Sequence, residues 1–102
     1  MKMTAAAILL SLFMTSANAI ATFGSYDCGQ WFTKHILARP WLLGYLSGLA
    51  EGDYEIGKVD VLDRLNSADQ AFLWMDNYCK SNPLKEVGEG AIDLYLELER
   101  QK

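Results

Sequence analysis

Two cysteines, Cys28 and Cys79, constrain the fold of this chain more than any other feature of its sequence. In an oxidising compartment, a cysteine pair in a small domain typically forms a disulfide. The bond would close a loop of about 50 residues, which stabilises a domain by roughly 4 kcal/mol in the chain-entropy model. A metal pair is the competing interpretation, but it needs further ligands, and only His35 offers another soft one. We therefore expect a Cys28–Cys79 disulfide.

The N-terminus indicates which compartment applies. Lys2 precedes a ten-residue apolar run from Ala5 to Met14, and Ala17-Asn18-Ala19 then matches the cleavage pattern of a secretory signal peptide. We expect residues 1–19 to be a signal peptide that is cleaved after Ala19, and the mature protein to be periplasmic or secreted. Because a membrane-spanning helix needs about twice this apolar length, membrane contact is expected only through an uncleaved signal peptide.

The mature chain, residues 20–102, is long enough for a single domain. Loss of Lys2 leaves eight Lys and Arg against 13 Asp and Glu, which is a net charge of −5. An acidic chain without a run of basic residues lacks the clustered cations that phosphate binding requires. We therefore expect no nucleic-acid partner.

The spacing of apolar residues predicts an all-α domain of about four helices. Asp27 is a suitable N-cap for a first helix from Cys28 to about Leu37. Pro40 suits the first turn of a second helix, because its missing N–H needs no partner there. Residues 51–58 then break the apolar period with two glycines and several charges, which predicts a loop.

The second half of the chain carries clearer helix signals. Residues 59–65 predict a short helical turn, and Ser67 with Gln70 forms a capping-box pattern before a helix from about Ala68 to Lys80. Asn82-Pro83 is expected to stop that helix and to start the last one. The disulfide would then tie the start of the first helix to the end of the third and close a small bundle.

Several small and aromatic residues are candidates for close packing or an interface. Gly44 and Gly48 lie four residues apart, so they share one helix face that another backbone can approach closely. We expect this contact to be inside the domain. The complete set of candidates is Trp41, Gly44, Tyr45, Gly48 and Trp74.

No residue pattern points to catalysis. His35 is the only histidine, and the glycines fit no phosphate-binding motif. Paired carboxylates such as Asp60 with Asp63 and Glu86 with Glu89 are typical of a solvated helix face. We therefore expect a protein that is not an enzyme, with no cofactor and no metal.

Two stretches, residues 41–48 (WLLGYLSG) and residues 74–84 (WMDNYCKSNPL), carry a resemblance to known proteins. Together with Cys28 and the signal peptide, their layout resembles the HdeA/HdeB type of small periplasmic helical protein. The resemblance implies an acid-stress chaperone that is a folded dimer near neutral pH and that binds unfolding clients in acid. The resemblance implies that Cys28 and Cys79 form the stabilising disulfide, and it identifies no client-binding residue.

The layout is also similar to the secreted helical immunity proteins that neutralise type VI secretion effectors. That resemblance implies a protein that binds and blocks a toxin. Since charges of opposite sign steer association, an acidic surface would suit a basic toxin. The candidate partner-binding residues are Glu51, Asp53, Tyr54 and Glu55. A structural or adaptor role in the periplasm is a third hypothesis.

Overall fold

The computed structural model describes residues 24–101, which form four α-helices and one short 3-10 helix and contain no β-strand. The predicted all-α fold is therefore confirmed for this part of the chain. The predicted signal peptide and its cleavage site lie outside the described residues. In chain order the elements are α2 (Cys28–Thr33), α3 (His35–Gly57), η1 (Val61–Arg64), α4 (Ala68–Ser81) and α5 (Val87–Arg100).

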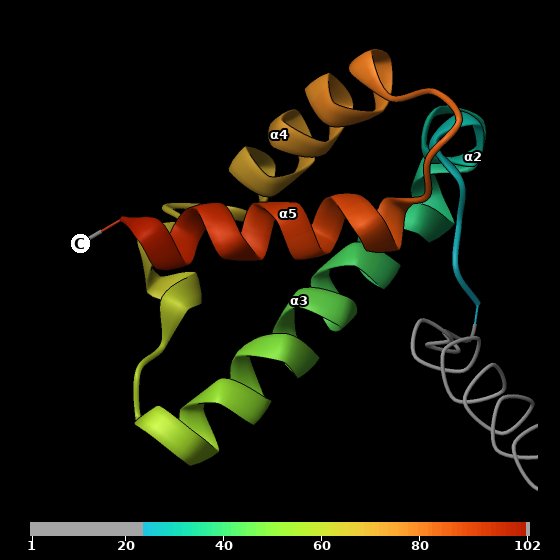
Figure 1. The fold of residues 1–102 in the computed structure, drawn as a ribbon. Coiled ribbons are helices and arrows are strands. Elements are labelled where there is room, and N and C mark those ends of the chain that lie inside the picture. The colour runs from blue at the N-terminus through green and yellow to red at the C-terminus, as the bar shows by residue number, and fades with distance from the viewer. Residues whose placement is uncertain (1–23, 102) are drawn as a thin grey trace, which may run out of the picture.

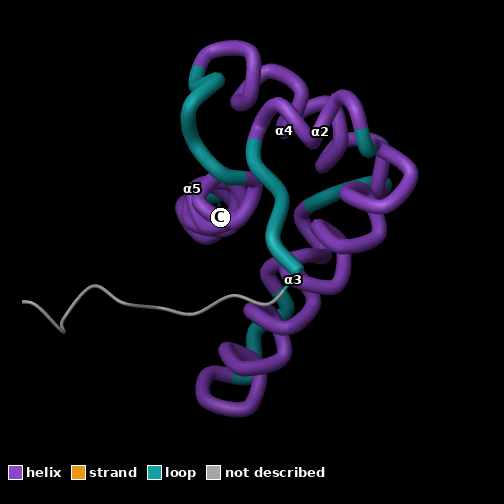
Figure 2. The backbone as a smooth tube through the Cα atoms, turned by 90° about the vertical axis from the view of Figure 1, so that its right-hand side faces the viewer, coloured by secondary structure: helices purple, strands orange, loops and turns teal. Residues whose placement is uncertain are grey.

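Helix α5 crosses both α3 and α4 (Figure 1). The short α2 packs against α3 and α4 near the N-terminal end of α5. Figure 2, which looks almost along α5, shows α2 and α4 together on one side and α3 running away below. The core lies where these helices meet and is centred on Trp31, Leu42, Met75 and Leu94. Helices α4 and α5 form because their apolar residues recur every three or four positions and face this core.

The first helical region differs from the prediction. Helix α2 ends at Thr33, Lys34 interrupts the backbone, and α3 begins at His35 rather than at Pro40. Pro40 thus lies inside α3, where it leaves the carbonyl of Ile36 without its helical donor. Ile36 is 76% exposed, so water can reach that part of the helix and reduce the cost.

The predicted loop over residues 51–58 is wrong, because α3 continues to Gly57 and is capped by Lys58 in a left-handed conformation (φ 58°). A glycine inside a helix costs only about 1 kcal/mol relative to alanine, and no second proline lies within α3 to remove a further backbone donor. Tertiary contacts outweigh that cost, since Ala50 is buried and the Tyr95 hydroxyl donates to Asp53 Oδ2 at 2.6 Å.

The expected close packing at Gly44 and Gly48 is not found inside the described domain. Both residues are exposed, and a Cβ atom added to either would have no atom within 4 Å apart from its chain neighbours and the nearby backbone of its own helix. The close approach occurs instead at Gly90 of α5, where a Cβ would lie 2.7 Å from the Tyr78 ring of α4. Gly90 therefore allows α4 and α5 to pack closely.

The junction between α4 and α5 also differs from the prediction. Asn82 ends α4, but α5 begins only at Val87, with Glu86 as its N-cap. Residues 83–85 form a turn, in which the Lys85 N–H donates to the Asn82 carbonyl, and Glu86 is extended and pairs with the chain before α2: Asp27 and Glu86 form an antiparallel bridge. Leu84, which a helix start at Pro83 would have placed inside the last helix, lies in this turn and is 97% exposed.

The start of α4 and the preceding turn agree with the prediction. Ser67 caps α4 by accepting from the backbone N–H of Gln70. The Gln70 side chain reaches back one residue further than a capping box requires and accepts from the Asn66 N–H at 2.8 Å. The predicted turn over residues 59–65 forms η1, with Val61 buried and Leu62 and Leu65 packed on the core.

Candidate functional site

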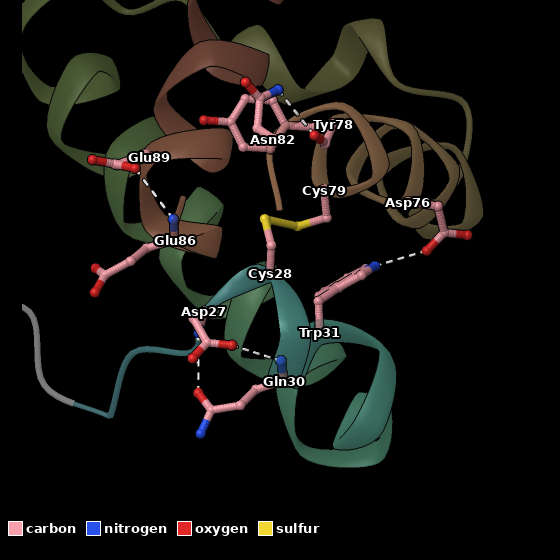
Figure 3. Close-up of a disulfide and its surroundings, with 10 residues drawn as sticks. All are labelled: Asp27, Cys28, Gln30, Trp31, Asp76, Tyr78, Cys79, Asn82, Glu86 and Glu89. Carbon is pink, nitrogen blue, oxygen red and sulfur yellow. Dashed lines mark hydrogen bonds between the residues drawn. A yellow bond between two sulfur atoms is a disulfide. The ribbon is translucent and has the colours of Figure 1, made fainter. Parts of the chain in front are cut away.

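The disulfide forms as predicted and joins the first residue of α2 to the last turn of α4 (Figure 3). The Cα atoms of Cys28 and Cys79 are 4.9 Å apart, and both residues are almost fully buried. The bond therefore fixes the relative position of α2 and α4 from inside the core.

Two helix N-termini meet beside the disulfide. The bridge between Asp27 and Glu86 is formed by Cys28 N–H donating to the Lys85 carbonyl and Val87 N–H donating to the Tyr26 carbonyl. Asp27 caps α2 by accepting from the Gln30 N–H at 2.7 Å. The backbone N–H of Glu86, the N-cap of α5, donates to the Glu89 carboxylate at 3.2 Å. Negative groups suit both positions, because unpaired N–H groups and the positive ends of helix dipoles converge there. We call this region the disulfide corner.

Three side-chain hydrogen bonds between helices share one chemistry, an aromatic donor and a carboxylate acceptor. The Trp31 indole of α2 donates to Asp76 of α4 at 2.7 Å. The Trp74 indole of α4 donates to Glu97 of α5, also at 2.7 Å. The third is the bond from Tyr95 of α5 to Asp53 of α3. Each contact thus depends on a carboxyl oxygen as its acceptor.

Tyr95 supplies the phenol among these three donors, and its pKa is shifted by its surroundings. Burial raises the pKa of the Tyr95 hydroxyl well above its usual value, and the hydrogen bond to Asp53 raises it further. A buried phenol is harder to ionise because the phenolate loses solvation and would face the negative Asp53 carboxylate. Tyr95 therefore remains a hydrogen-bond donor throughout the neutral range.

The aromatic residues among the predicted interface candidates, Trp41, Tyr45 and Trp74, belong to two groups of rings. Trp41 stacks on Tyr45 with ring centroids 5.1 Å apart, and Tyr26 meets the edge of Trp41 at 6.1 Å. Trp74 stacks on Tyr78 at 5.3 Å. All of these rings are half-buried and pack against the core. The two groups lie on different helices and do not form one site.

The predicted partner-binding residues lie on the last two turns of α3, not on a loop. Glu51, Tyr54 and Glu55 are exposed there, whereas the Asp53 carboxylate is engaged by Tyr95. The Lys58 ammonium lies 5.4 Å from the centre of the Tyr54 ring. A hollow of about 350 Å³ adjoins this ring and is lined by Ser47, Ala50, Glu51, Tyr54, Asp60 and Leu62. We call residues 51–60 the α3 tip.

A second surface was not predicted from the sequence. Phe32, Ile36 and Leu37 are exposed where α2 meets α3, beside a hollow of about 410 Å³ lined by residues 33–37. The sequence predicted one helix from Cys28 to about Leu37, without a break at Lys34. The break at Lys34 turns α2 relative to α3, and only a signal for that break would have revealed the exposed group.

Within residues 24–101, no three side chains among His, Cys, Asp and Glu lie close enough together to hold a metal ion. No helix in that range has both the length and the apolar character needed to cross a membrane. The absence of catalytic chemistry, cofactors and metals from this protein stays a prediction. No known protein family, curated protein or solved structure matches this chain.

Proposed function

We propose that the protein is a periplasmic acid-stress chaperone, without enzymatic activity, that loosens in acid and binds unfolding clients. The observation that supports this proposal best is the set of three aromatic-to-carboxylate hydrogen bonds, which join α2 to α4, α4 to α5 and α5 to α3. Each one weakens when its acceptor is protonated.

The energetic effect of acid on these contacts is substantial for a small domain. A hydrogen bond to a charged group contributes about 1.5–3 kcal/mol, and a neutral one about half of that. Side-chain carboxyl groups titrate near pH 4 in model peptides, so acid of about pH 2 protonates carboxylates in general. Since a whole domain is stable by only about 5–15 kcal/mol, weakening three contacts removes a large share of its stability.

The change in net charge acts in the same direction. At neutral pH the mature chain carries eight basic and 13 acidic residues, and full protonation of the carboxylates leaves the eight basic residues plus His35, about +9 without the termini. Self-repulsion of this size favours an expanded state. The disulfide would keep α2 and α4 together in that state, so expansion would expose the core aromatics without complete unfolding.

The direct test is client protection in acid. Purified mature protein is mixed with an acid-labile enzyme such as alcohol dehydrogenase at about pH 2.5, where carboxylates are neutral. Light scattering from the client should fall as the protein is added, and a hydrophobic dye should become fluorescent. A protein that keeps its native near-UV circular dichroism at this pH and leaves client aggregation unchanged would contradict the proposal.

Two substitutions test whether the carboxylates are the trigger. In an Asp53→Asn, Glu97→Gln variant the carboxamide oxygens can still accept from Tyr95 and Trp74 but cannot be protonated in this range. The variant should then be less stable than the unchanged protein at pH 7 and should lose less stability between pH 7 and about pH 2.5, because its bonds are already neutral ones. Asp63→Asn, Asp69→Asn is the matched control, because it removes two carboxylates from exposed positions of η1 and α4. An equal reduction of the pH dependence in both variants would assign the effect to net charge alone.

Neutralisation of a basic toxin is a second candidate, favoured by the α3 tip. Glu51, Asp60 and the exposed Tyr54 ring border one hollow, and such a site accommodates a Lys or Arg side chain through charge and ring contact. Co-purification with a basic effector protein, lost in a Glu51→Lys, Tyr54→Ala variant, would favour this role. A gene neighbourhood without an effector gene would count against it.

A further inference from the structure

Six consecutive residues at the junction of α2 and α3 are exposed, and half of them are large and apolar. Phe32, Ile36 and Leu37 have exposed fractions of 44%, 76% and 61%. The hollow beside them is lined by residues 33–37 alone, so no second helix forms an opposing wall. These residues therefore form an exposed corner rather than a groove between helices. We call residues 32–37, together with the exposed Arg39, the junction patch.

The charged side chains of the junction patch are basic. Residues 28–50 contain no Asp or Glu, and the Lys and Arg residues of that stretch, Lys34 and Arg39, both belong to the patch. The Arg39 guanidinium lies 5.0 Å from the centre of the Phe72 ring of α4, which holds it beside the junction. Helix α3 also begins there without a side-chain cap and without an acid in its first turn. The mature chain thus has a basic segment although its net charge is −5.

The most exposed apolar side chains elsewhere in the described chain have a different setting. Ile56 is 88% exposed and Leu84 is 97% exposed. Their neighbours carry acids, since Glu55 precedes Ile56, and Lys85 and Glu86 follow Leu84. A carboxylate beside an apolar side chain repels a negative surface, whereas the cations of the junction patch attract one. The junction patch is therefore better suited than either of these positions to a partner that is both apolar and anionic.

The size and form of the junction patch favour a lipid bilayer over a protein as that partner. Three apolar side chains are far fewer than the roughly 20–30 residues a side that a stable protein interface uses. A bilayer needs no complementary shape. Apolar side chains enter the boundary between headgroups and acyl chains, while Lys and Arg reach the phosphates from long apolar stems. An anionic phospholipid surface therefore satisfies both kinds of side chain in the patch.

We propose that the folded protein binds the surface of an anionic phospholipid bilayer through the junction patch. Phe32, Ile36 and Leu37 enter the headgroup region, and Lys34 and Arg39 contact lipid phosphates. The contact is peripheral, since no helix within residues 24–101 is long and apolar enough to span a membrane. The α3 tip lies at the other end of a 23-residue helix, so its acids can remain away from the negative lipids (Figure 1). This contact goes beyond the proposed chaperone role and requires no acid.

The test is flotation of the mature protein with lipid vesicles at pH 7. Phosphatidylethanolamine vesicles with about one third phosphatidylglycerol supply the anionic surface, and phosphatidylcholine vesicles are the neutral comparison. A single fatty acyl chain gives half binding at about 0.1 mM lipid, and this smaller contact should give it at about 1 mM anionic lipid. Binding should fall in about 1 M salt, which shortens the screening length to about 3 Å. An unchanged near-UV circular dichroism spectrum would show that the bound protein is folded.

The apolar side chains are tested by an Ile36→Ser, Leu37→Ser variant. It should bind anionic vesicles at least about tenfold more weakly, because two side chains no longer leave water on binding. Ile56→Ser, Leu84→Ser is the matched control, since it makes the same two changes at more exposed positions. The control should bind as the unchanged protein does. Circular dichroism confirms that each variant is folded.

The basic side chains are tested by a Lys34→Gln, Arg39→Gln variant, which should also bind about tenfold more weakly. Lys58→Gln, Arg100→Gln makes the same change in net charge at the α3 tip and at the end of α5, and should bind nearly as the unchanged protein does. An equal loss in both charge variants would assign binding to net charge and overturn the proposal. It would also be overturned by the absence of binding to anionic vesicles, by equal binding to neutral ones, or by full binding of Ile36→Ser, Leu37→Ser.

Discussion

The disulfide corner and the α3 tip are held together by different kinds of interaction. At the corner, a buried covalent bond, a pair of backbone hydrogen bonds and two capped helix N-termini meet. At the tip, every residue from 51 to 60 is exposed, and the Tyr95–Asp53 hydrogen bond ties the last turns of α3 to α5. Next to the tip, Arg64 of η1 donates to the Leu98 and Glu99 carbonyls of α5. Denaturant, heat or a change of pH should therefore loosen the tip before the corner.

Breaking the disulfide should have the largest effect on this difference. A Cys28→Ser, Cys79→Ser variant loses the constraint on the unfolded chain and should be less stable by roughly 4 kcal/mol. Urea denaturation with circular dichroism measures this change. Reduction of the unchanged protein should give a similar loss after the buried bond is broken, and an unaltered urea midpoint in both cases would show that the corner owes its stability to non-covalent packing.

Gly90→Ala should weaken the contact between α4 and α5 by about 1–3 kcal/mol, because the new methyl group would overlap the Tyr78 ring. The available space is small, since Tyr78 lies 2.7 Å and the Met75 sulfur 2.8 Å from the position of the added Cβ. The midpoint of thermal unfolding checks the prediction. A variant as stable as the parent would mean that α4 and α5 can separate slightly at no cost.

Tyr95→Phe should cost about 1.5 kcal/mol at neutral pH by removing the bond to Asp53 at the tip, the lower end of the range for a bond to a charged group, because water can solvate the exposed Asp53 carboxylate. Because burial, followed by the Asp53 hydrogen bond, raises the folded-state pKa of Tyr95 above its unfolded value near 10, its contribution is complete below pH 10 and declines as pH rises further. The unchanged protein should therefore lose stability in alkali, and the variant should lose less. Urea midpoints between about pH 7 and 11, which span the ordinary phenol pKa, provide the measurement.

Part of this alkaline loss should persist in Tyr95→Phe. Burial and, to a lesser degree, the nearby Asp93 and Glu89 carboxylates raise the pKa of Tyr78, which belongs to the α4–α5 contact. A variant whose stability falls as steeply as that of the parent would assign the alkaline effect to Tyr78 rather than to the tip.

Gly52→Ala should have the smallest effect and the opposite sign. Gly52 lies in the helical part of the tip, and a Cβ there would meet no atom within 4 Å. Alanine should stabilise the helix by about 0.5–1 kcal/mol, because it loses less backbone freedom on folding. Thermal unfolding of Gly52→Ala and Gly90→Ala, measured side by side, compares the same substitution at an open position and at a crowded one. Destabilisation at Gly52 would imply a contact at the tip.

The sequence predicted local features that have one dominant cause. The disulfide followed from two cysteines behind a predicted signal peptide, and the caps at Asp27 and Ser67 followed from their side chains. The prediction failed where tertiary contacts outweigh local preference. Pro40 and Gly52 are both tolerated inside α3, and the pairing of Asp27 with Glu86 delays the start of α5.

Less of the candidate site could be predicted from the sequence, because it too depends on tertiary contacts. The partners of Trp31, Trp74 and Tyr95 are 23 to 45 residues away in the chain, and no local pattern connects a ring to a distant carboxylate. Gly44 and Gly48 were correctly placed on one face, but the pattern could not say whether that face pointed inward. Only the helix packing distinguishes Gly90, which is crowded, from these two.

The placement of the disulfide also determines how a protease would affect the molecule. The bond from Cys28 to Cys79 makes a covalent ring that contains α2, α3, η1 and nearly all of α4, and α5 lies outside it. A single cut anywhere within the ring leaves both fragments linked through the sulfur atoms. A cut in the exposed stretch from Pro83 to Glu86 instead turns α5 into a separate peptide that is retained only by its packing and hydrogen bonds.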